Sequence, residues 1–341
     1  MNHSSRTAIL LAAAGPVSLI LACLPGPAPI PVREVLSILA SAVGLAPAPA
    51  DPALATVVLG IRAARAVLAF GVGAALSLAG VAFQGILRNP LADPFTLGVS
   101  TGAAFGACLA LALGLSAPAF LPLADPLPFF GLLGAFLALL AVLGLARSGR
   151  ELKRETLVLA GVVTATFLSA CIALLKALDE STVSGLVFWI MGSFQGRGWG
   201  HVLVFLPYLA LGAGLILFFA RELDILSMGS TQARLLGLSA DRSRLVLLLA
   251  GSLLSGAAVA VSGVIGFVGL VVPHLVRRVQ GGEHRPLAVN AALLGGLLLL
   301  WSDVLARTLL PGGVELPVGV LTALLGGPFF CLLLRDRREA A

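Results

Sequence analysis

Charged residues are scarce in this chain, and their scarcity decides its class. Asp, Glu, Lys and Arg make up 11% of the 341 residues, whereas hydrophobic residues make up 59%. A soluble domain carries about 25% charged residues, so a water-soluble protein of this composition would expose far too much apolar surface. A lipid bilayer is the solvent that suits such a sequence. The composition therefore predicts a membrane protein.

Lysine, tyrosine and closely spaced cysteines are also rare. The four cysteines lie far apart, which predicts neither a zinc site nor a redox pair, and no bound metal is expected. Neither Lys153 nor Lys176 stands in the Gly-x-x-x-x-Gly-Lys-Ser/Thr pattern that cradles nucleotide phosphates. The single tyrosine leaves no basic-aromatic cluster to stack bases, so nucleic acid is not an expected partner. We therefore expect neither an enzyme nor ATP hydrolysis by this chain itself.

Long apolar runs are what the sequence has in abundance. Ten runs approach the roughly 20 residues of a membrane span, although the eighth is short and contains Pro273. They are 7–24, 62–83, 95–115, 126–146, 156–178, 201–220, 245–265, 266–277, 287–309 and 316–334. The first could also be a signal peptide, but Leu21 stands where a cleavage site favours a small residue. The pattern predicts an all-α polytopic membrane protein with ten transmembrane helices.

Basic residues give the orientation of these predicted spans. With the N-terminus inside, 16 of the 22 lysines and arginines fall on inner loops and ends, and 6 fall outside. Positive charge is favoured on the cytoplasmic side, so both termini are expected in the cytoplasm. Two longer polar intervals remain. One, outside, contains a candidate interfacial helix at 32–43, and the other, inside, contains a short amphipathic piece at 230–238 that invites a partner.

Three segments carry specific motifs. They are AGVAFQGILRNPLADP at 79–94, SGVIGFVGLVVPH at 262–274 and ELPVGVLTALLGGP at 315–328. In these segments the chain resembles the iron-siderophore, haem and cobalamin permease family of ABC importers, and the likeness runs from about Arg62 to the C-terminus. The resemblance implies the type II ABC importer permease fold, with residues 1–341 as a single transmembrane permease domain.

The resemblance also implies partners and a location. The partners would be a second copy or a close paralogue, two cytoplasmic ATP-binding subunits and a periplasmic or lipid-anchored substrate-binding protein, all in contact with membrane lipid. The chain itself would bind no cofactor, because ATP and Mg²⁺ would sit on the ATPase. The expected location is the bacterial cytoplasmic (inner) membrane.

Roles for individual residues follow from the same resemblance. The cytoplasmic segment of about 227–240 is similar to the helices that couple the permease to the ATPase, which singles out Met228, Gly229, Ala233, Arg234, Leu236, Gly237 and Leu238. Arg62, Arg65 and Arg307 lie on the outer side against the positive-inside bias and match arginines that dock the binding protein. Local pairing of Arg307 with Asp303, four residues before it, and snorkelling to the interface are the alternatives.

The remaining candidates are motif residues with a structural or a transport role. They are Gln84, Arg88, Asn89, Pro90, Asp93, Pro94, Gly98, Pro273, His274, Arg277, Glu315 and Pro317. The acids Asp93, Asp303 and Glu315 could sense substrate or relay protons, but residues near span ends more often cap helices or pair with arginine.

The sequence therefore predicts the permease subunit of a binding-protein-dependent ABC importer that works by alternating access. Its cargo would be an iron complex (ferric siderophore or haem) or cobalamin. The alternative is an ion-coupled secondary transporter, whose signature is a set of buried acids or broken helices at the membrane midplane. An intramembrane enzyme is the third class, but no catalytic pair of residues is spaced to support it.

Overall fold

The computed structural model describes residues 3–49, 51–116, 125–148, 151–152, 154–178 and 189–339. Within these residues the first half of the chain forms α1 (His3–Ala22), α2 (Val32–Ala42), α3 (Pro52–Ala55), the π-helical η1 (Thr56–Ala63), α4 (Ala64–Leu87), the 3₁₀ helix η2 (Pro94–Leu97), α5 (Val99–Ala112), α6 (Leu127–Ala146) and α7 (Arg154–Leu178). A ladder of two residues per strand, β1 (Arg147–Ser148) and β2 (Glu151–Leu152), joins α6 to α7.

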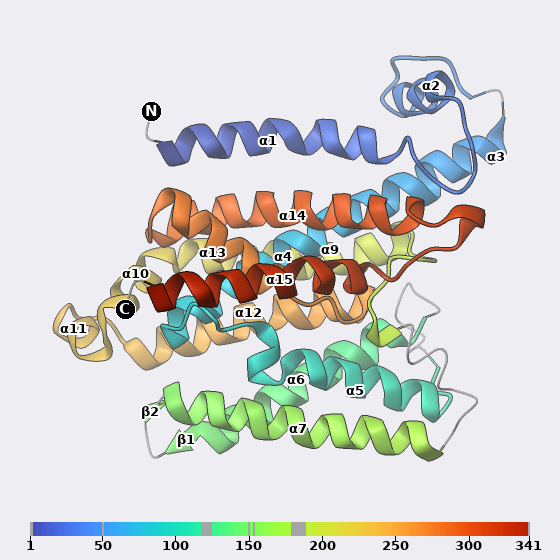
Figure 1. Ribbon diagram of the computed structural model, residues 1–341. Helices are drawn as coiled ribbons and strands as arrows, with labels where there is room; N and C mark the ends of the chain where they lie inside the picture. The colour runs from blue at the N-terminus through green and yellow to red at the C-terminus, as the bar shows by residue number, and fades with distance from the viewer. Residues whose placement is uncertain are drawn as a thin grey trace.

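The second half of the chain is also helical. It comprises α9 (Trp199–Phe218), α10 (Ala220–Met228), α11 (Ser230–Leu235), α12 (Ala240–Ser262), α13 (Val268–Gln280), α14 (His284–Thr308), the 3₁₀ helix η3 (Pro311–Gly313) and α15 (Val318–Glu339). The long helices run side by side as a bundle, with α1 on one flank and α7 on the other (Figure 1).

Helix α4 forms the centre of the bundle. It continues from α3 and η1 as one apolar helical stretch over 52–87, and 89% of its most apolar window is buried by other helices. It packs against α14, α12, α13 and α9. A Cβ atom added to Gly73 would collide with the backbone carbonyl of Gly295 in α14, and one added to Gly80 would collide with that of Gly269 in α13. Small residues thus allow the close backbone approach that membrane helices use for association.

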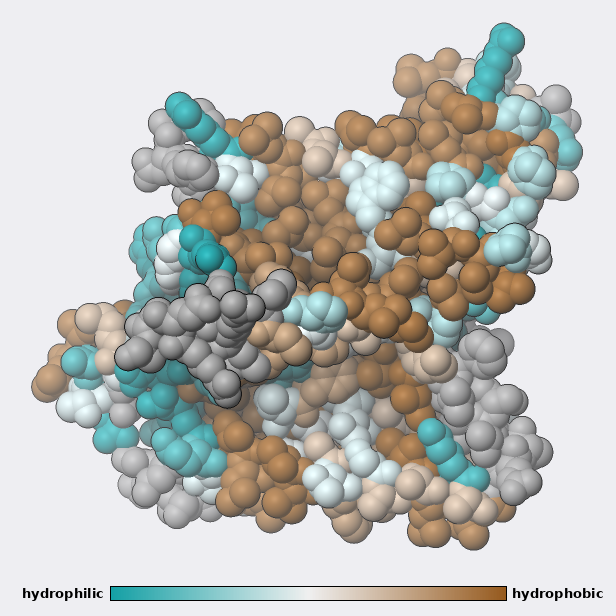
Figure 2. Space-filling model, in the orientation of Figure 1, coloured by the Kyte–Doolittle hydropathy of each residue, from teal (hydrophilic) through white to brown (hydrophobic). Residues whose placement is uncertain are grey.

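The two ends of the bundle differ in what they carry. In Figure 1, α1 begins and α15 ends at the same end, which also holds α10, α11 and the β1–β2 ladder, whereas α2 and α3 lie at the opposite end. Figure 2 shows hydrophobic side chains over the sides of the helices and a concentration of hydrophilic side chains around the end that holds α10 and α11. An apolar belt between polar ends is the surface that a bilayer-spanning bundle requires.

The all-α prediction is confirmed, and each of the ten apolar runs coincides with a helix. The second run begins ten residues too late, because helix already starts at Pro52. In the described part of the chain, six helices are long and apolar enough to cross a membrane, and three apolar helices are shorter. The eighth run is the 13-residue helix α13. The count of ten complete spans and the assignment of residues 1–341 to one domain stay predictions.

Candidate functional site

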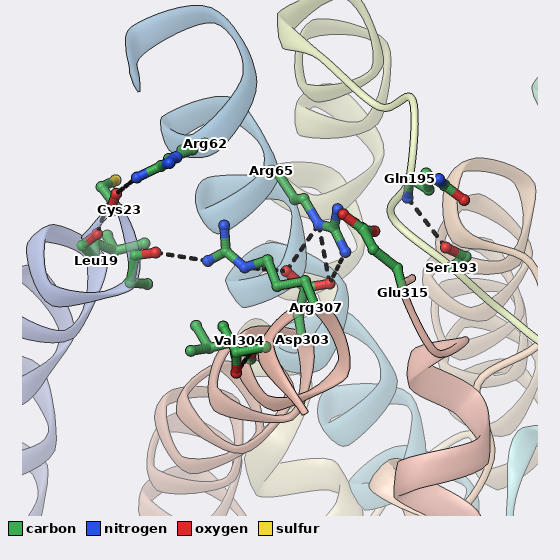
Figure 3. A network of polar contacts seen from close by, with 12 residues as sticks. Leu19, Cys23, Arg62, Arg65, Ser193, Gln195, Asp303, Val304, Arg307 and Glu315 are labelled. Atoms are coloured by element: carbon green, nitrogen blue, oxygen red, sulfur yellow. Dashed lines mark hydrogen bonds and ion pairs between the residues drawn. The ribbon is translucent and has the colours of Figure 1, made fainter. Parts of the chain in front are cut away.

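A buried network of charged side chains joins three elements at the end of the bundle near α2 (Figure 3). Arg65 of α4 lies at its centre. Its Nε and Nη2 donate to the carboxylate of Asp303 in α14 at 2.9–3.1 Å, and its Nη1 donates to Oε2 of Glu315 at 2.7 Å. Glu315 belongs to the connection between η3 and α15. One guanidinium therefore ties α4 and α14 to the start of α15.

Two further arginines tie this network to the end of α1. Arg307 Nη2 donates to the carbonyl of Ala22 at 2.6 Å, and its Nε lies 3.8 Å from Asp303 Oδ2. Arg62 donates to the carbonyls of Cys23 and Leu24 at 3.0 and 2.8 Å, and also to that of Ala28. The last carbonyls of a helix lack partners within the helix, and these guanidinium groups supply donors and positive charge where the helix dipole is negative.

The three arginines predicted to dock a binding protein are thus engaged within the chain. Arg62, Arg65 and Arg307 are 3%, 5% and 4% exposed. The predicted contact between Arg307 and Asp303 on one helix face is present, although Asp303 bonds more closely to Arg65. Docking stays a prediction, and a partner would have to reach arginines that already hold carboxylates or carbonyls.

A cavity of about 590 Å³, largely open to its surroundings, lies where several chain segments are not helical. The turn before η2 contributes Leu91 and Asp93, and the stretch that follows the undescribed residues 179–188 contributes Met191. The break between α12 and α13 contributes Phe267, and the first turn of α15 contributes Gly319. The cavity is therefore bordered by helix ends and connections from four parts of the chain.

The motif around this cavity is built to hold the turn from α4 to α5. Arg88 is the C-cap residue that follows α4, and its φ of 48° lies in the left-handed region. The side chain of Asn89 accepts from the backbone N–H of Leu91 at 3.0 Å. Asp93 caps η2 by accepting from the backbone N–H of Phe95, and Pro94 occupies the first position of that helix.

Burial of this capping carboxyl changes its acidity. Desolvation raises the pKa of Asp93 from 3.8 to about 6, although the hydrogen bond from Phe95 opposes the shift.

Gln84 donates weakly to the carbonyls of Gly269 and Leu270 at 3.3–3.4 Å, and Gly98 adopts φ 72° before α5. The capping and pairing interpretation of Asp93, Asp303 and Glu315 is therefore the one that matches their contacts.

The other motif residues fall on α13 and just before α15. Pro273 is buried within α13, with His274 half-buried beside it and Arg277 in the last turn of the helix. Pro317 follows Glu315 and precedes α15. None of these residues is among those that line the cavity, whose lining includes Leu270 and Gly319 close to them in sequence.

The predicted coupling segment stands outside the bundle. Helices α10 and α11 meet at Gly229, whose φ of 126° favours glycine, and Gly237, two residues after the last residue of α11, has φ 79°. Ala233 is fully buried, whereas Met228, Arg234 and Leu236 are exposed and Leu238 is half-buried. Leu235, which was not singled out, is 82% exposed. The segment thus exposes apolar side chains beyond the end of the bundle.

Sequence reasoning missed two polar contacts that position the helices. Asp224 of α10 accepts from both the backbone N–H (2.9 Å) and the ring Nδ1 (2.6 Å) of His284, which begins α14. At the other end, the Arg197 guanidinium pairs with Asp125 next to His201. Burial raises the pKa of Asp125, but hydrogen bonds from His201 and Leu127 and the charge of Arg197 bring it down to about 2. Only the polar character of these residues next to apolar runs was visible in the sequence.

Comparison with known proteins supports the family resemblance that the sequence motifs indicated. The FecCD transport family matches residues 12–336. An ABC transporter permease protein of Bacillus subtilis is 46% identical over 83% of this chain and 80% of its own length. The cobalamin import system permease protein of Halobacterium salinarum is 40% identical over 85% of this chain and 76% of its own. The hemin transport system permease protein of Yersinia pestis is 42% identical over 82% of this chain and 84% of its own.

A solved structure has the same architecture. A metal-chelate type ABC transporter in an inward-facing conformation superposes with a TM-score of 0.83 at 32% identity, covering 97% of this chain and 99% of the other. The chain belongs to the FecCD transport family.

Proposed function

We propose that this chain is the membrane-spanning permease subunit of a binding-protein-dependent ABC importer in a bacterial inner membrane. Its cargo would be an iron complex (ferric siderophore or haem) or cobalamin. The observation that carries the proposal is α11, a short helix that exposes Leu235 and Leu236 beyond the bundle end. Exposed leucines at a tip attached to α10 and α12 suit a docking contact through which a partner moves both helices.

The cavity supports the transport part of the proposal. It is lined by the turn before η2, the break between α12 and α13 and the start of α15, each of which is a helix end and not a helix interior. Relative movement of such ends opens or closes a path without breaking helical hydrogen bonds. A bulky cargo needs a wider path than one chain offers, so a second copy or a close paralogue would complete it.

The buried network supports the docking of a binding protein, but by another route than direct contact with three free arginines. Arg65 and Arg307 face the carboxylates of Asp303 and Glu315, whereas Arg62 donates only to backbone carbonyls. Three guanidinium groups and two carboxylates leave the cluster with an excess positive charge. A carboxylate from an outer partner would be attracted to this excess. We expect docking to act through the charge of the whole cluster and not through three free side chains.

The two termini would lie in the cytoplasm with α10 and α11, and the arginine cluster would lie outside. The distribution of lysine and arginine along the chain supports this orientation. Two ATP-binding subunits, which would carry ATP and Mg²⁺, would sit at the α11 end.

An ion-coupled secondary transporter remains the second candidate because one of its marks is present. The helix between 240 and 280 is broken at Gly263–Phe267, and this break lines the cavity. Ion coupling would also require an acid that is available at the cavity. Asp93 lines the cavity but is used as a helix cap, and Asp303 is held by Arg65.

Pull-down of the tagged chain from gently solubilised native membranes tests the proposal. We expect mass spectrometry to find a P-loop ATPase and an iron- or cobalt-containing cargo in the wild-type sample. Leu235→Ser with Leu236→Ser should lose the ATPase, whereas Val279→Ser, which changes another exposed apolar residue, on α13, should retain it. Recovery of the wild-type chain without an ATPase, together with proton- or sodium-dependent uptake, would support the second candidate instead.

A further inference from the structure

An apolar groove runs along the outside of the bundle, away from the cavity and the coupling segment. Its volume is about 530 Å³, and it lies between α6, α9 and α12. The walls are partly exposed side chains, among them Phe136 of α6 and Leu211 of α9. Its floor is formed by buried residues, including Ala250 and Ser252 of α12. The volume falls within the range of about 300–1,000 Å³ that is usual for ligand sites.

The groove is elongated parallel to the helices. On α6 alone, its lining extends from Phe129 to Leu139, which corresponds to about 15 Å at a rise of 1.5 Å per residue. Because these helices are membrane-spanning, the long axis of the groove follows the bilayer normal. An acyl chain in a membrane has this direction and this apolar chemistry.

The groove also has a polar end. Phe129, Leu132 and Tyr208 line it and at the same time line a smaller cavity of about 40 Å³ that reaches Asp125. Asp125 pairs with Arg197 at the outer end of α6 and α9. A channel that is apolar at mid-span and polar at the level of the helix ends matches the two parts of an amphiphile.

We propose that the groove between α6, α9 and α12 is a binding site for one acyl chain of a membrane phospholipid, with the headgroup near the Asp125–Arg197 pair. The site would retain this chain more firmly than the lipid that surrounds the bundle, because side chains of three helices, α6, α9 and α12, contact the acyl chain in the groove. The inference depends on the chain spanning a membrane, and it depends on neither the cargo nor the ATPase partner.

Ser252 provides a way to narrow the groove from its floor. Its side chain is buried, and its hydroxyl has no hydrogen-bond partner. Replacement by leucine fills the floor of the groove and removes an unsatisfied buried hydroxyl, so no bond is lost. A matched control is Ala13→Leu, which adds a leucine to the exposed surface of α1.

The experiment uses the full chain in vesicles that contain a phospholipid with a photoreactive diazirine in the middle of one acyl chain. After illumination, labelled residues are mapped by mass spectrometry. We expect label on the groove residues Leu133, Phe136 and Leu211 to exceed severalfold the label on Leu10 and Val17, which are exposed on α1. Ser252→Leu should bring the groove label down to the level on α1, and Ala13→Leu should leave it unchanged.

Two results would overturn the proposal, and both can be read from the wild-type chain alone. Equal labelling of the groove and of α1 would mean surrounding lipid only. Labelling of α1 with none in the groove would mean that protein, such as a second copy of this chain, covers the groove. Loss of ATPase capture in the pull-down would leave the labelling pattern unaffected, so the two proposals fail separately.

Discussion

The two ends of the bundle use arginine and leucine in opposite ways. At the α2 end, arginines are buried and each holds carboxylates or carbonyls from other elements. At the α11 end, leucines are exposed on a short helix that little else supports. A buried charge network resists change because any lost partner leaves an unpaired charge, whereas an exposed helix at a bundle tip changes position at small cost. One end of the bundle is therefore held in a fixed geometry, whereas the helix at the other end can change position at a smaller cost in free energy.

The largest expected effect comes from removing the shared carboxylate of the network. Asp303→Asn leaves Arg65 and Arg307 buried without their common negative partner. Breaking a buried pair in this way costs about 3–5 kcal/mol. Thermal unfolding in detergent should show a strong loss of stability.

Glu315→Gln is the control for this change, because Glu315 is more exposed and its amide replacement keeps an acceptor for Arg65. It should cost about 1 kcal/mol. Equal stability of the two variants would mean that the network does not hold the fold at this end.

The next largest effect is expected from a substitution at Gly237, which follows α11 and has a left-handed backbone conformation. Gly237 has φ 79°, and a Cβ atom at this position would meet no other atom within 4 Å. Gly237→Val should therefore act through the left-handed backbone conformation alone, at a cost of about 1–2 kcal/mol, and it should change how α11 ends. Uptake should fall relative to ATP hydrolysis in the reconstituted complex. Normal uptake would contradict the coupling role of this segment.

A smaller effect is expected at the cap beside the cavity. Asp93→Ala removes the cap of η2 and should cost about 1 kcal/mol, whereas Asp93→Asn keeps a capping oxygen. Because the folded pKa of Asp93 is raised to about 6, the folded chain binds this proton more tightly than the unfolded chain does. The stability of the wild type relative to Asp93→Asn should therefore fall as the pH rises from about 4 through 6. If the difference in free energy of unfolding between the wild type and Asp93→Asn does not change over this pH range, the burial of the Asp93 carboxyl is contradicted.

The smallest effect on stability is expected for the exposed leucines of α11. Leu235→Ser changes an exposed side chain and should alter the free energy of unfolding by no more than about 0.5 kcal/mol. Uptake should nevertheless be lost if α11 docks the ATPase. A marked loss of stability would show that α11 is held by the bundle, and retained uptake would show that Leu235 touches no partner.

The helices themselves were predictable from the sequence. A bilayer offers no partner for an unpaired backbone N–H or C=O, so an apolar run of sufficient length has to become a helix. The run 126–146 became α6 (Leu127–Ala146) nearly residue for residue. The early start of helix at Pro52 was missed because residues 52–61 lie before Arg62, where the predicted span begins, and read as part of a loop rich in proline and alanine.

The residues of the candidate site were also visible, but their contacts were not. Arg65 and Asp303 are 238 positions apart, and Arg65 and Glu315 are 250 apart. The outer position of Arg65 suggested a surface contact with a partner, but folding turned it inward to two carboxylates. Asp224 and His284, 60 positions apart, form a pair that no local pattern indicates.

By itself, the sequence determined that the chain is a helical membrane protein with polar ends and with a short amphipathic segment between two apolar runs, because hydrophobicity and charge act locally along the chain. Only the tertiary structure decided which arginines are buried, which helix ends meet around the cavity and where a groove opens between α6, α9 and α12. These features depend on the crossing of helices that are distant in sequence, and glycines such as Gly73 allow those crossings by letting backbones touch.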